Sequence, residues 1–217
     1  MTTQLAIYNR ALELIGETQL ASLTEARSVR RKLDTVWDAG ASGTGGVKAC
    51  LEMGAWNFAM RTVEASYDPD VTPSFGYTYA FSKPSDFMKL DKICSDEELR
   101  SPILDYVDEQ NHWYCAYDTI YLSFVSNHAN YGGDLTIWPE YFIDMVVAYF
   151  AMRVSASTTK DDDKTLALEA RLKRAKISAK SSDAANQPPG VQPRGSWIRS
   201  RSEGNRGDRG SRTTLIG

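Results

Sequence analysis

The sequence predicts an α+β fold, a helical bundle of about four to five helices with an inserted antiparallel β region and an extended C-terminal arm. Apolar residues recur at helical spacing in residues 1–62, alternate with polar residues through much of 63–138, and return to helical spacing in 139–186. Residues 187–217 contain six Gly, three Pro and six Arg, with too few apolar side chains to form a core. We therefore expect four regions: N-terminal helices, a β-rich insertion, C-terminal helices and an extended arm rich in Arg and Gly.

Three helices are predicted in the N-terminal region. The first has an apolar face and ends at Gly16. Its apolar residues are Leu5, Tyr8, Leu12 and Ile15. The second begins with Thr24 as its N-cap and stops at Gly40, and the third covers residues 47–59. The glycine-rich segment Gly40–Gly46 is interpreted as a loop that joins the last two helices.

The period of the apolar residues changes in the middle of the chain. Phe75, Tyr77, Tyr79 and Phe81 alternate with small or polar residues, which predicts a strand with one buried face. Further strands are predicted at residues 87–93, 103–108, 112–116, 120–125 and 135–138. Starts about ten residues apart, with turns between them, are typical of an antiparallel meander.

Two helices are predicted after the β region. Pro139 suits a first helical turn, and residues 141–154 are apolar on almost every side, so we expect that helix to be central and buried. The acidic run Asp161–Asp163 begins the final helix, where carboxylates favour the helix dipole. Its expected apolar stripe consists of Leu166, Ala170, Leu172, Ala175 and Ile177.

The charge is unevenly distributed along the chain. Residues 1–186 carry 19 basic and 26 acidic side chains, a net charge of −7, whereas residues 187–217 carry +4. The arm is therefore interpreted as the only basic segment, and an acidic body argues against general coating of nucleic acid. The longest uncharged apolar run, Met145–Met152, is far shorter than the ~20 residues that a membrane span needs. We expect a soluble protein without a signal peptide, with reduced cysteines.

Motifs for bound cofactors and catalysis were considered in turn. Gly46 and Val47 precede Lys48, which does not fit the spacing of a phosphate-binding P-loop. His112 and His128 have no second ligand at metal-binding spacing, and we predict no cofactor and no metal. Two acidic clusters leave a glycoside hydrolase open as an alternative, against solvated loops. They are Asp96, Glu97 and Glu98, and Asp105, Asp108 and Glu109.

Four short motifs together resemble a known family, the tail tubular protein A or head-to-tail adaptor proteins of short-tailed bacteriophages. The motifs are Ile15-Gly16-Glu17 at the end of the first helix, Ala55-Trp56-Asn57-Phe58-Ala59, the strand–turn–strand step around Lys83-Pro84-Ser85-Asp86, and Trp138-Pro139-Glu140-Tyr141-Phe142. The match extends over about residues 3–185 in order. The sequence departs from the family at Gly40–Gly46, where the family tends to keep one long helix, and in the arm after Trp197.

The resemblance implies a structural virion protein made in the host cytoplasm and without catalytic activity. Its copies would form a ring, commonly a dodecamer, between the portal protein and a tail nozzle similar to tail tubular protein B. Double-stranded DNA would pass through the lumen during ejection without sequence-specific contacts. A ring requires two different faces of each subunit to bind each other, which is a heterologous interface.

The arm is the part of the chain that we expect to bind the portal. An extended segment that becomes ordered on a partner can clamp it, with apolar anchors and arginines that reach carboxylates. The expected contact residues are Arg194, Trp197, Ile198, Arg199 and Arg201. Two alternatives to the adaptor remain at this point: a tail-associated hydrolase of cell-envelope glycan, and a nucleic-acid-binding module that acts through the basic arm.

Overall fold

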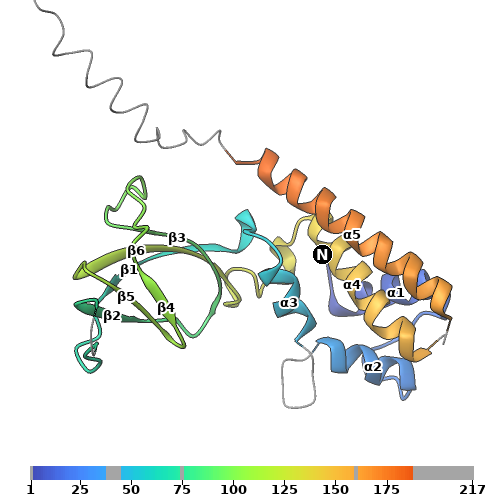
Figure 1. The fold of residues 1–217 in the computed structure, drawn as a ribbon. Coiled ribbons are helices and arrows are strands. Elements are labelled where there is room, and N and C mark those ends of the chain that lie inside the picture. Colours follow the sequence, from blue (N-terminus) through green and yellow to red (C-terminus); the bar gives the residue numbers. More distant parts are fainter. Residues whose placement is uncertain (1, 38–44, 74–75, 159–160, 188–217) are drawn as a thin grey trace, which may run out of the picture. The chain divides into compact units, whose positions relative to one another are not determined.

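The computed structural model describes residues 2–37, 45–73, 76–158 and 161–187. The chain divides into two units, Met1–Asn186 and Gln187–Gly217, and every helix and strand described below belongs to the first unit. Figure 1 labels these elements. They are five α-helices and two antiparallel three-stranded sheets, so the predicted α+β fold is confirmed.

The elements follow the predicted order of helices, strands and helices. The helices are α1 (Gln4–Ile15), α2 (Ser28–Trp37), α3 (Gly46–Glu52), α4 (Glu140–Thr158) and α5 (Asp162–Ala185), with short 3-10 helices η1 (Asn57–Ala59) and η2 (Leu135–Ile137). The strands are β1 (Met60–Ser66), β2 (Tyr79–Ser82), β3 (Phe87–Cys94), β4 (Val107–Glu109), β5 (His112–Cys115) and β6 (Thr119–Ser126).

Helix α4 is the central element of the helical part, as its apolar sequence predicts. It contacts all four other helices, and its buried residues lie on every side of the helix, as far as Val154 and Ser155. The carbonyl of Pro139 accepts from the N–H groups of Phe142 and Ile143, which puts Pro139 just before the first turn. In the described part of the chain, no helix is long and apolar enough to cross a membrane.

Helix α1 ends at Gly16 as predicted, but α2 begins at Ser28, three residues later than a helix capped by Thr24 would begin. Gly16 ends α1 in the left-handed conformation, with φ of 84°, which suits glycine. Thr24 is not an N-cap, because its hydroxyl is paired with that of Ser22 and the chain turns again before α2. Arg27 secures this turn through hydrogen bonds to Thr18.

Helix α3 is shorter than the predicted helix over residues 47–59. The indole N–H of Trp56 donates to the carbonyl of Cys50 at 3.1 Å, and this is the carbonyl that Gly54 would need if the helix continued. The Trp56 ring also lies so close to Gly54 that a Cβ there would come within 2.7 Å of it. The side chain of Trp56 thus ends the helix.

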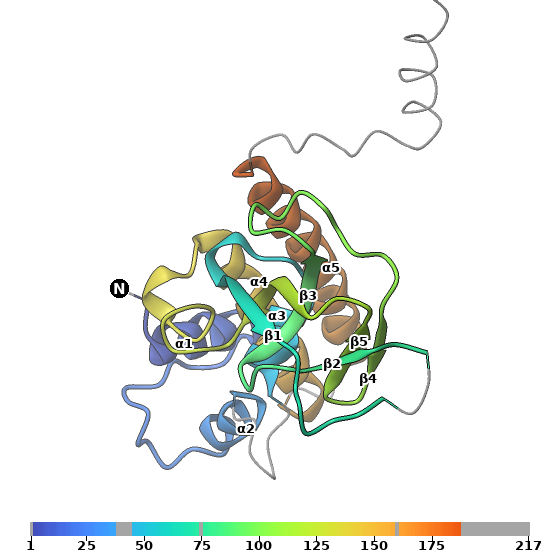
Figure 2. The ribbon, with the colours of Figure 1, turned by 90° about the vertical axis from the view of Figure 1, so that its left-hand side faces the viewer.

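The strands form two sheets and not one meander. Their orders are β1-β6-β3 and β2-β5-β4, so the last strand in the chain lies between the first and the third. The predicted strands that correspond to β3, β5 and β6 are confirmed, whereas β1 was not predicted. The strand predicted at residues 135–138 is replaced by η2 over Leu135–Ile137, because the Asp134 carboxylate accepts from the Thr136 N–H and starts a helical turn. Figure 2 shows the strands from a second direction.

Two of the predicted strands are shorter in the structure. The strand predicted from Phe75 to Phe81 corresponds to β2, which covers only Tyr79–Phe81 of that range and extends to Ser82. Phe75 itself lies outside the described residues. The strand expected from Ile103 begins at Val107. Before it, Pro102 forms an isolated bridge with Cys94 at the end of β3.

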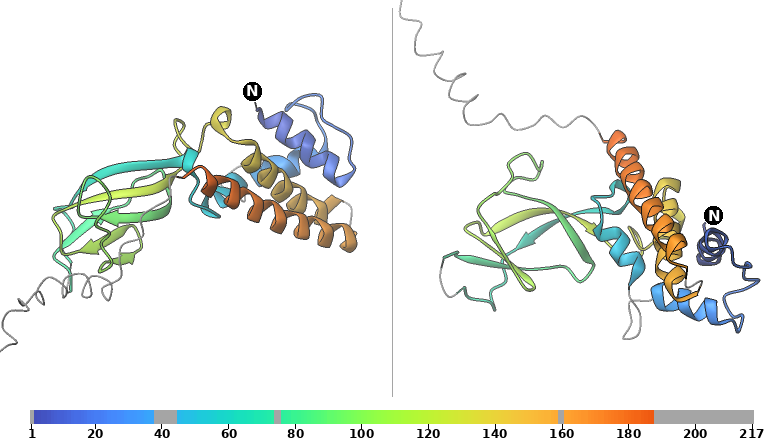
Figure 3. Two further views of the ribbon diagram at one scale, coloured as in Figure 1. Left: turned by 90° about the horizontal axis from the view of Figure 1, so that it is seen from above. Right: turned by 45° about the vertical axis from the view of Figure 1, so that its right-hand side comes forward.

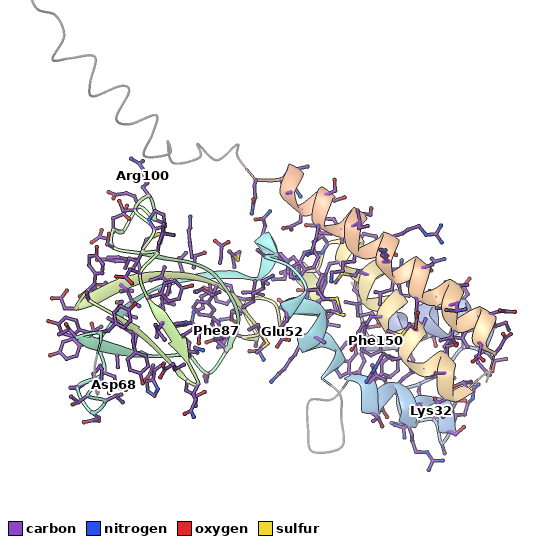
Figure 4. All side chains as sticks on the ribbon, viewed as in Figure 1. Lys32, Glu52, Asp68, Phe87, Arg100 and Phe150 are labelled. Carbon is purple, nitrogen blue, oxygen red and sulfur yellow. The ribbon has the colours of Figure 1, made fainter. Side chains whose placement is uncertain are left out.

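Two clusters of buried residues stabilise the first unit. The larger one lies among the helices and includes Phe150, and the smaller one lies between the two sheets and is bordered by Phe87 (Figure 4). Phe81, Trp113 and Phe124 are fully buried in the smaller cluster. Each aromatic ring buries a large apolar area, so these rings contribute strongly to the stability of the unit.

Candidate interaction surfaces

The five residues predicted to contact a partner lie outside the described residues, so their prediction stays a prediction. They are Arg194, Trp197, Ile198, Arg199 and Arg201. Most of the Gly40–Gly46 loop also lies outside them, except for Gly45 and Gly46, and Gly46 begins α3. The candidate sites considered below are therefore those of the first unit.

Two of the four family-like motifs meet at Phe142, in the first turn of α4. The ring centroids of Trp56, Phe58 and Trp138 lie 5.1, 4.8 and 5.0 Å from the Phe142 centroid. The indole N–H of Trp138 donates to the Gly132 carbonyl at 2.9 Å. These aromatic residues join α4 to the segment that leads into β1, so their role is architectural.

Asp183 attaches α5 to the same region, where α4 meets the segment that leads into β1. Its carboxylate accepts from the backbone N–H of Asn57 at 3.1 and 3.2 Å and from the Tyr141 hydroxyl at 2.7 Å. The Asn57 amide donates in turn to the Asp183 carbonyl at 2.8 Å. Asp183 is only 3% exposed, and these donors explain how a carboxylate is tolerated there. Burial and the bond to Asp183 raise the pKa of Tyr141 to about 12.

Asp86 belongs to a third of the family-like motifs, and it is also buried and hydrogen-bonded. It follows Lys83-Pro84-Ser85 at the turn between β2 and β3, and its carboxylate accepts from the Ser126 hydroxyl and from Arg61 at 2.7 Å. Its backbone carbonyl accepts from the N–H of Asn127. The residue therefore joins the turn to the adjoining ends of β1 and β6.

Several carboxylates of the two acidic clusters considered for glycan hydrolysis form hydrogen bonds or ion pairs with nearby residues. Backbone N–H groups of Arg100 and Ser101 donate to Asp96 and hold the pKa of its carboxyl below the usual range. Asp105 accepts from the Tyr77 hydroxyl at 2.7 Å, and Asp108 is paired with Lys83. These bonds account for three of the six candidate carboxylates without catalysis, and the hydrolase remains an alternative hypothesis.

The histidines and cysteines were the other candidate chemical groups. The ring of His128 accepts from the backbone N–H of Asn130, and His112 lies on β5 beside Tyr114. Cys50, Cys94 and Cys115 are all buried and free, and burial raises the pKa of each thiol. Within the described ranges, no three His, Cys, Asp or Glu side chains are grouped as a metal site would require.

A basic surface on α5 contradicts the prediction that the arm is the only basic segment. The predicted apolar stripe is also wrong in part, because Leu166 and Ile177 are each 62% exposed and Ala170 is exposed as well. We call this side of the helix the α5 surface: Leu166, Glu169, Ala170, Lys173, Arg174, Ile177 and Lys180, with three cations and one carboxylate. The side packed against α4 instead uses Leu168, Leu172, Ala175, Ala179 and Asp183. Figure 3 shows α5 lying along α4.

The cations of the α5 surface have no ionic partner among the described residues. None of Lys173, Arg174 and Lys180 forms a salt bridge there. Partial burial and the ammonium groups of Lys176 and Lys89 lower the pKa of Lys180. Like charges this close repel one another, so an anionic neighbour would be favourable at this surface.

An open hollow lies on the outward face of the second sheet, beside β4. In β5, Trp113 and Cys115 point into the core and Tyr114 points outward, so Val107, its partner in the ladder, also faces outward. We call the hollow the β4 pocket: Thr72, Pro73, Gly76, Tyr77, Val107, Glu109 and Tyr114 line it. Its walls are mostly aromatic and apolar, while Glu109 and Asp105, the partner of Tyr77, bring carboxylates to it.

No protein-family model matches the chain, and no curated protein matches it.

Proposed function

We propose that this chain is a structural virion protein, a head-to-tail adaptor whose copies form a ring between the portal and the tail nozzle. The observation that carries the proposal is the convergence of the family-like motifs at buried joints. Trp56, Trp138 and Phe142 connect α4 with the segment before β1, and Asp86 connects the strands. Motif residues with architectural roles are what a protein needs when its function is to hold a shape in an assembly.

The surfaces of the first unit support the same proposal. The basic and apolar α5 surface and the acidic and aromatic β4 pocket are unlike each other, and each is exposed to solvent. Two unlike surfaces on one chain are the requirement for a heterologous interface, which closes into a ring when the rotation between copies allows it. In this proposal the genome passes through the ring, the arm binds the portal, and no cofactor takes part.

Electron microscopy of the purified full chain, alone and with a portal assembly, tests the adaptor proposal. We expect rings with a central channel in at least one of the two conditions, and the mass of the particle gives the copy number, for which we expect twelve. Monomers under both conditions would contradict the proposal, and so would open filaments, because a filament has no place between portal and nozzle.

A matched pair of deletions tests the arm separately. Removing residues 187–217 should leave ring formation intact and abolish binding to the portal, because Trp197 and Ile198 are the expected anchors. Removing only Ser202–Gly217 keeps these anchors and should preserve binding. Equal loss of portal binding in both variants would place the contact outside Arg194–Arg201.

A further inference from the structure

Helix α5 has two apolar sides, and only one of them is covered. Leu168, Leu172, Ala175 and Ala179 recur every three or four residues and pack against the helical core. Leu166, Ala170 and Ile177 recur at similar helical spacing about half a turn away and are exposed. Leu166 and Ile177 are separated by roughly 16 Å along the helix. Lys173 lies between them on the same side, so this side of α5 offers a partner two exposed apolar anchors flanked by cations.

The charges on the α5 surface restrict its partner. Lys173 and Arg174 lie one turn before Ile177, and Lys180 follows it by three residues, so the apolar stripe is bordered by cations. The arm carries +4 and is repelled by such a surface, which argues against the chain's own C-terminal residues as the occupant. Nucleic acid would use the cations, but a phosphate backbone gains little from the exposed apolar side chains of Leu166 and Ile177. A protein surface with carboxylates around an apolar hollow would bind both the cations and the exposed apolar side chains of the α5 surface.

The β4 pocket has this complementary character. Pro73, Val107 and Tyr114 form apolar walls, and Glu109 lines the pocket among them. Asp105 adds a second carboxylate through its bond with Tyr77, whose hydroxyl donates at 2.7 Å. An apolar side chain that enters the pocket would therefore bring neighbouring cations towards two carboxylates, and tyrosines are frequent in such contacts.

We propose that the α5 surface of one copy of this chain docks on the β4 pocket of a second copy. Ile177 is the apolar anchor, and Lys173 and Arg174 face Glu109 and Asp105. The two surfaces are different, so the contact is heterologous and leaves each copy free to bind a further copy at its other surface. This inference rests on the proposed function, because an adaptor requires that the successive contacts between copies close into a ring.

Charge reversal on each surface tests the contact in the full chain. One variant carries Lys173→Glu and Arg174→Glu, and a second carries Asp105→Lys and Glu109→Lys. Each alone places like charges across the contact, and we expect its self-association, measured by sedimentation velocity, to weaken by about tenfold or more. An equimolar mixture should recover association, because the reversed α5 surface then meets the reversed β4 pocket.

A matched control separates the contact from net charge. Lys48→Glu with Arg153→Glu changes the charge by the same amount as the Lys173→Glu, Arg174→Glu variant, at exposed positions outside both surfaces, and should associate as the unchanged chain does. If both reversed variants were misfolded by circular dichroism, cysteine pairing supplies a second measurement, since the three native cysteines are buried. Chains with Ile177→Cys and chains with Val107→Cys should form disulfide-linked dimers when mixed, and far fewer when either is oxidised alone.

The outcomes distinguish this inference from the adaptor proposal. Rings that persist in the charge-reversed variants overturn the contact and leave the adaptor proposal standing. Filaments that the same variants dissolve support the contact and contradict the adaptor. A chain that stays monomeric at every concentration and forms no mixed disulfide overturns the contact. Loss of duplex DNA binding in the Lys173→Glu, Arg174→Glu variant with unchanged association overturns it too, and assigns the α5 surface to nucleic acid.

Discussion

Asp86 illustrates how a single polar residue connects three parts of the chain. It follows a proline-containing turn, it is 8% exposed, and its carboxylate meets Arg61 at the start of β1 and Ser126 at the end of β6. Burial by itself would raise the pKa of this carboxyl, but the hydrogen bonds from Ser126 and Arg61 outweigh burial and lower the pKa below its ordinary value of 3.8. The ionised form is therefore favoured in the folded protein.

We expect the contribution of Asp86 to depend on pH. Because its folded pKa is depressed, its stabilisation is present above pH 3.8 and is lost as the pH falls through the lower folded value. Asp86→Asn should reduce the free energy of unfolding at pH 7 by about 2 kcal/mol, since Arg61 loses its ionic acceptor. Urea unfolding between pH 7 and pH 2 should show this difference shrink below pH 4, whereas Asp70→Asn, at an exposed aspartate, should change little. A difference independent of pH would contradict the assignment.

At the scale of elements, α5 shows how packing against other elements decides which of two possible apolar sides of a helix is buried. Leu166 and Leu168 are two residues apart on the same helix, and either could belong to an amphipathic stripe. Leu168 is 7% exposed and belongs to the core among the helices, whereas Leu166 is 62% exposed. The bond network of Asp183 orients the helix, since it attaches the same side of α5 to Asn57 and Tyr141.

The two leucines of α5 therefore provide a matched pair of substitutions. Leu168→Ala should lower the free energy of unfolding by about 2–3 kcal/mol, because it leaves a cavity against the core. Leu166→Ala should change it by less than about 0.5 kcal/mol. Chemical denaturation of the two variants measures both values. Similar losses at the two positions would mean that both faces of α5 are covered in the isolated chain.

At the scale of the whole molecule, both buried clusters belong to residues 1–186. One cluster lies among the helices and the other between the sheets, and aromatic contacts around Phe142 connect α4 to the chain that enters β1. The chain divides after Asn186, at the end of α5. The stability of the first unit should therefore not depend on the arm.

Truncation after Asn186 tests this independence. The shortened chain should unfold cooperatively, with a midpoint within about 2 °C of that of the full chain, because it keeps every described residue of the two buried clusters. Differential scanning calorimetry at a concentration where both chains are monomeric makes the comparison. A midpoint lowered by about 5 °C or more would show that the arm contributes to the stability of the body.

Features that depend on neighbours in sequence were predictable. Helix α1 and its end at Gly16, the buried α4, the start of α5 at Asp161 and the strands β3, β5 and β6 all follow from residue spacing and local turn chemistry. The candidate surfaces could not be predicted to the same extent from residue spacing. The cations of α5 are visible in the sequence, but that none of them forms a salt bridge with a described carboxylate is visible only in space.

The sequence by itself determined the fold class, the order of helices and strands, and the concentration of arginine after residue 187. Only the tertiary structure decided where α3 stops, which side of α5 is buried, and that β6 lies between β1 and β3. The physical reason is the range of the interactions. Periodicity, caps and turns act over a few residues, whereas the bond from Trp56 to Cys50, the burial of Leu168 and the pairing of β1 with β6 depend on side chains and strands that only folding brings together.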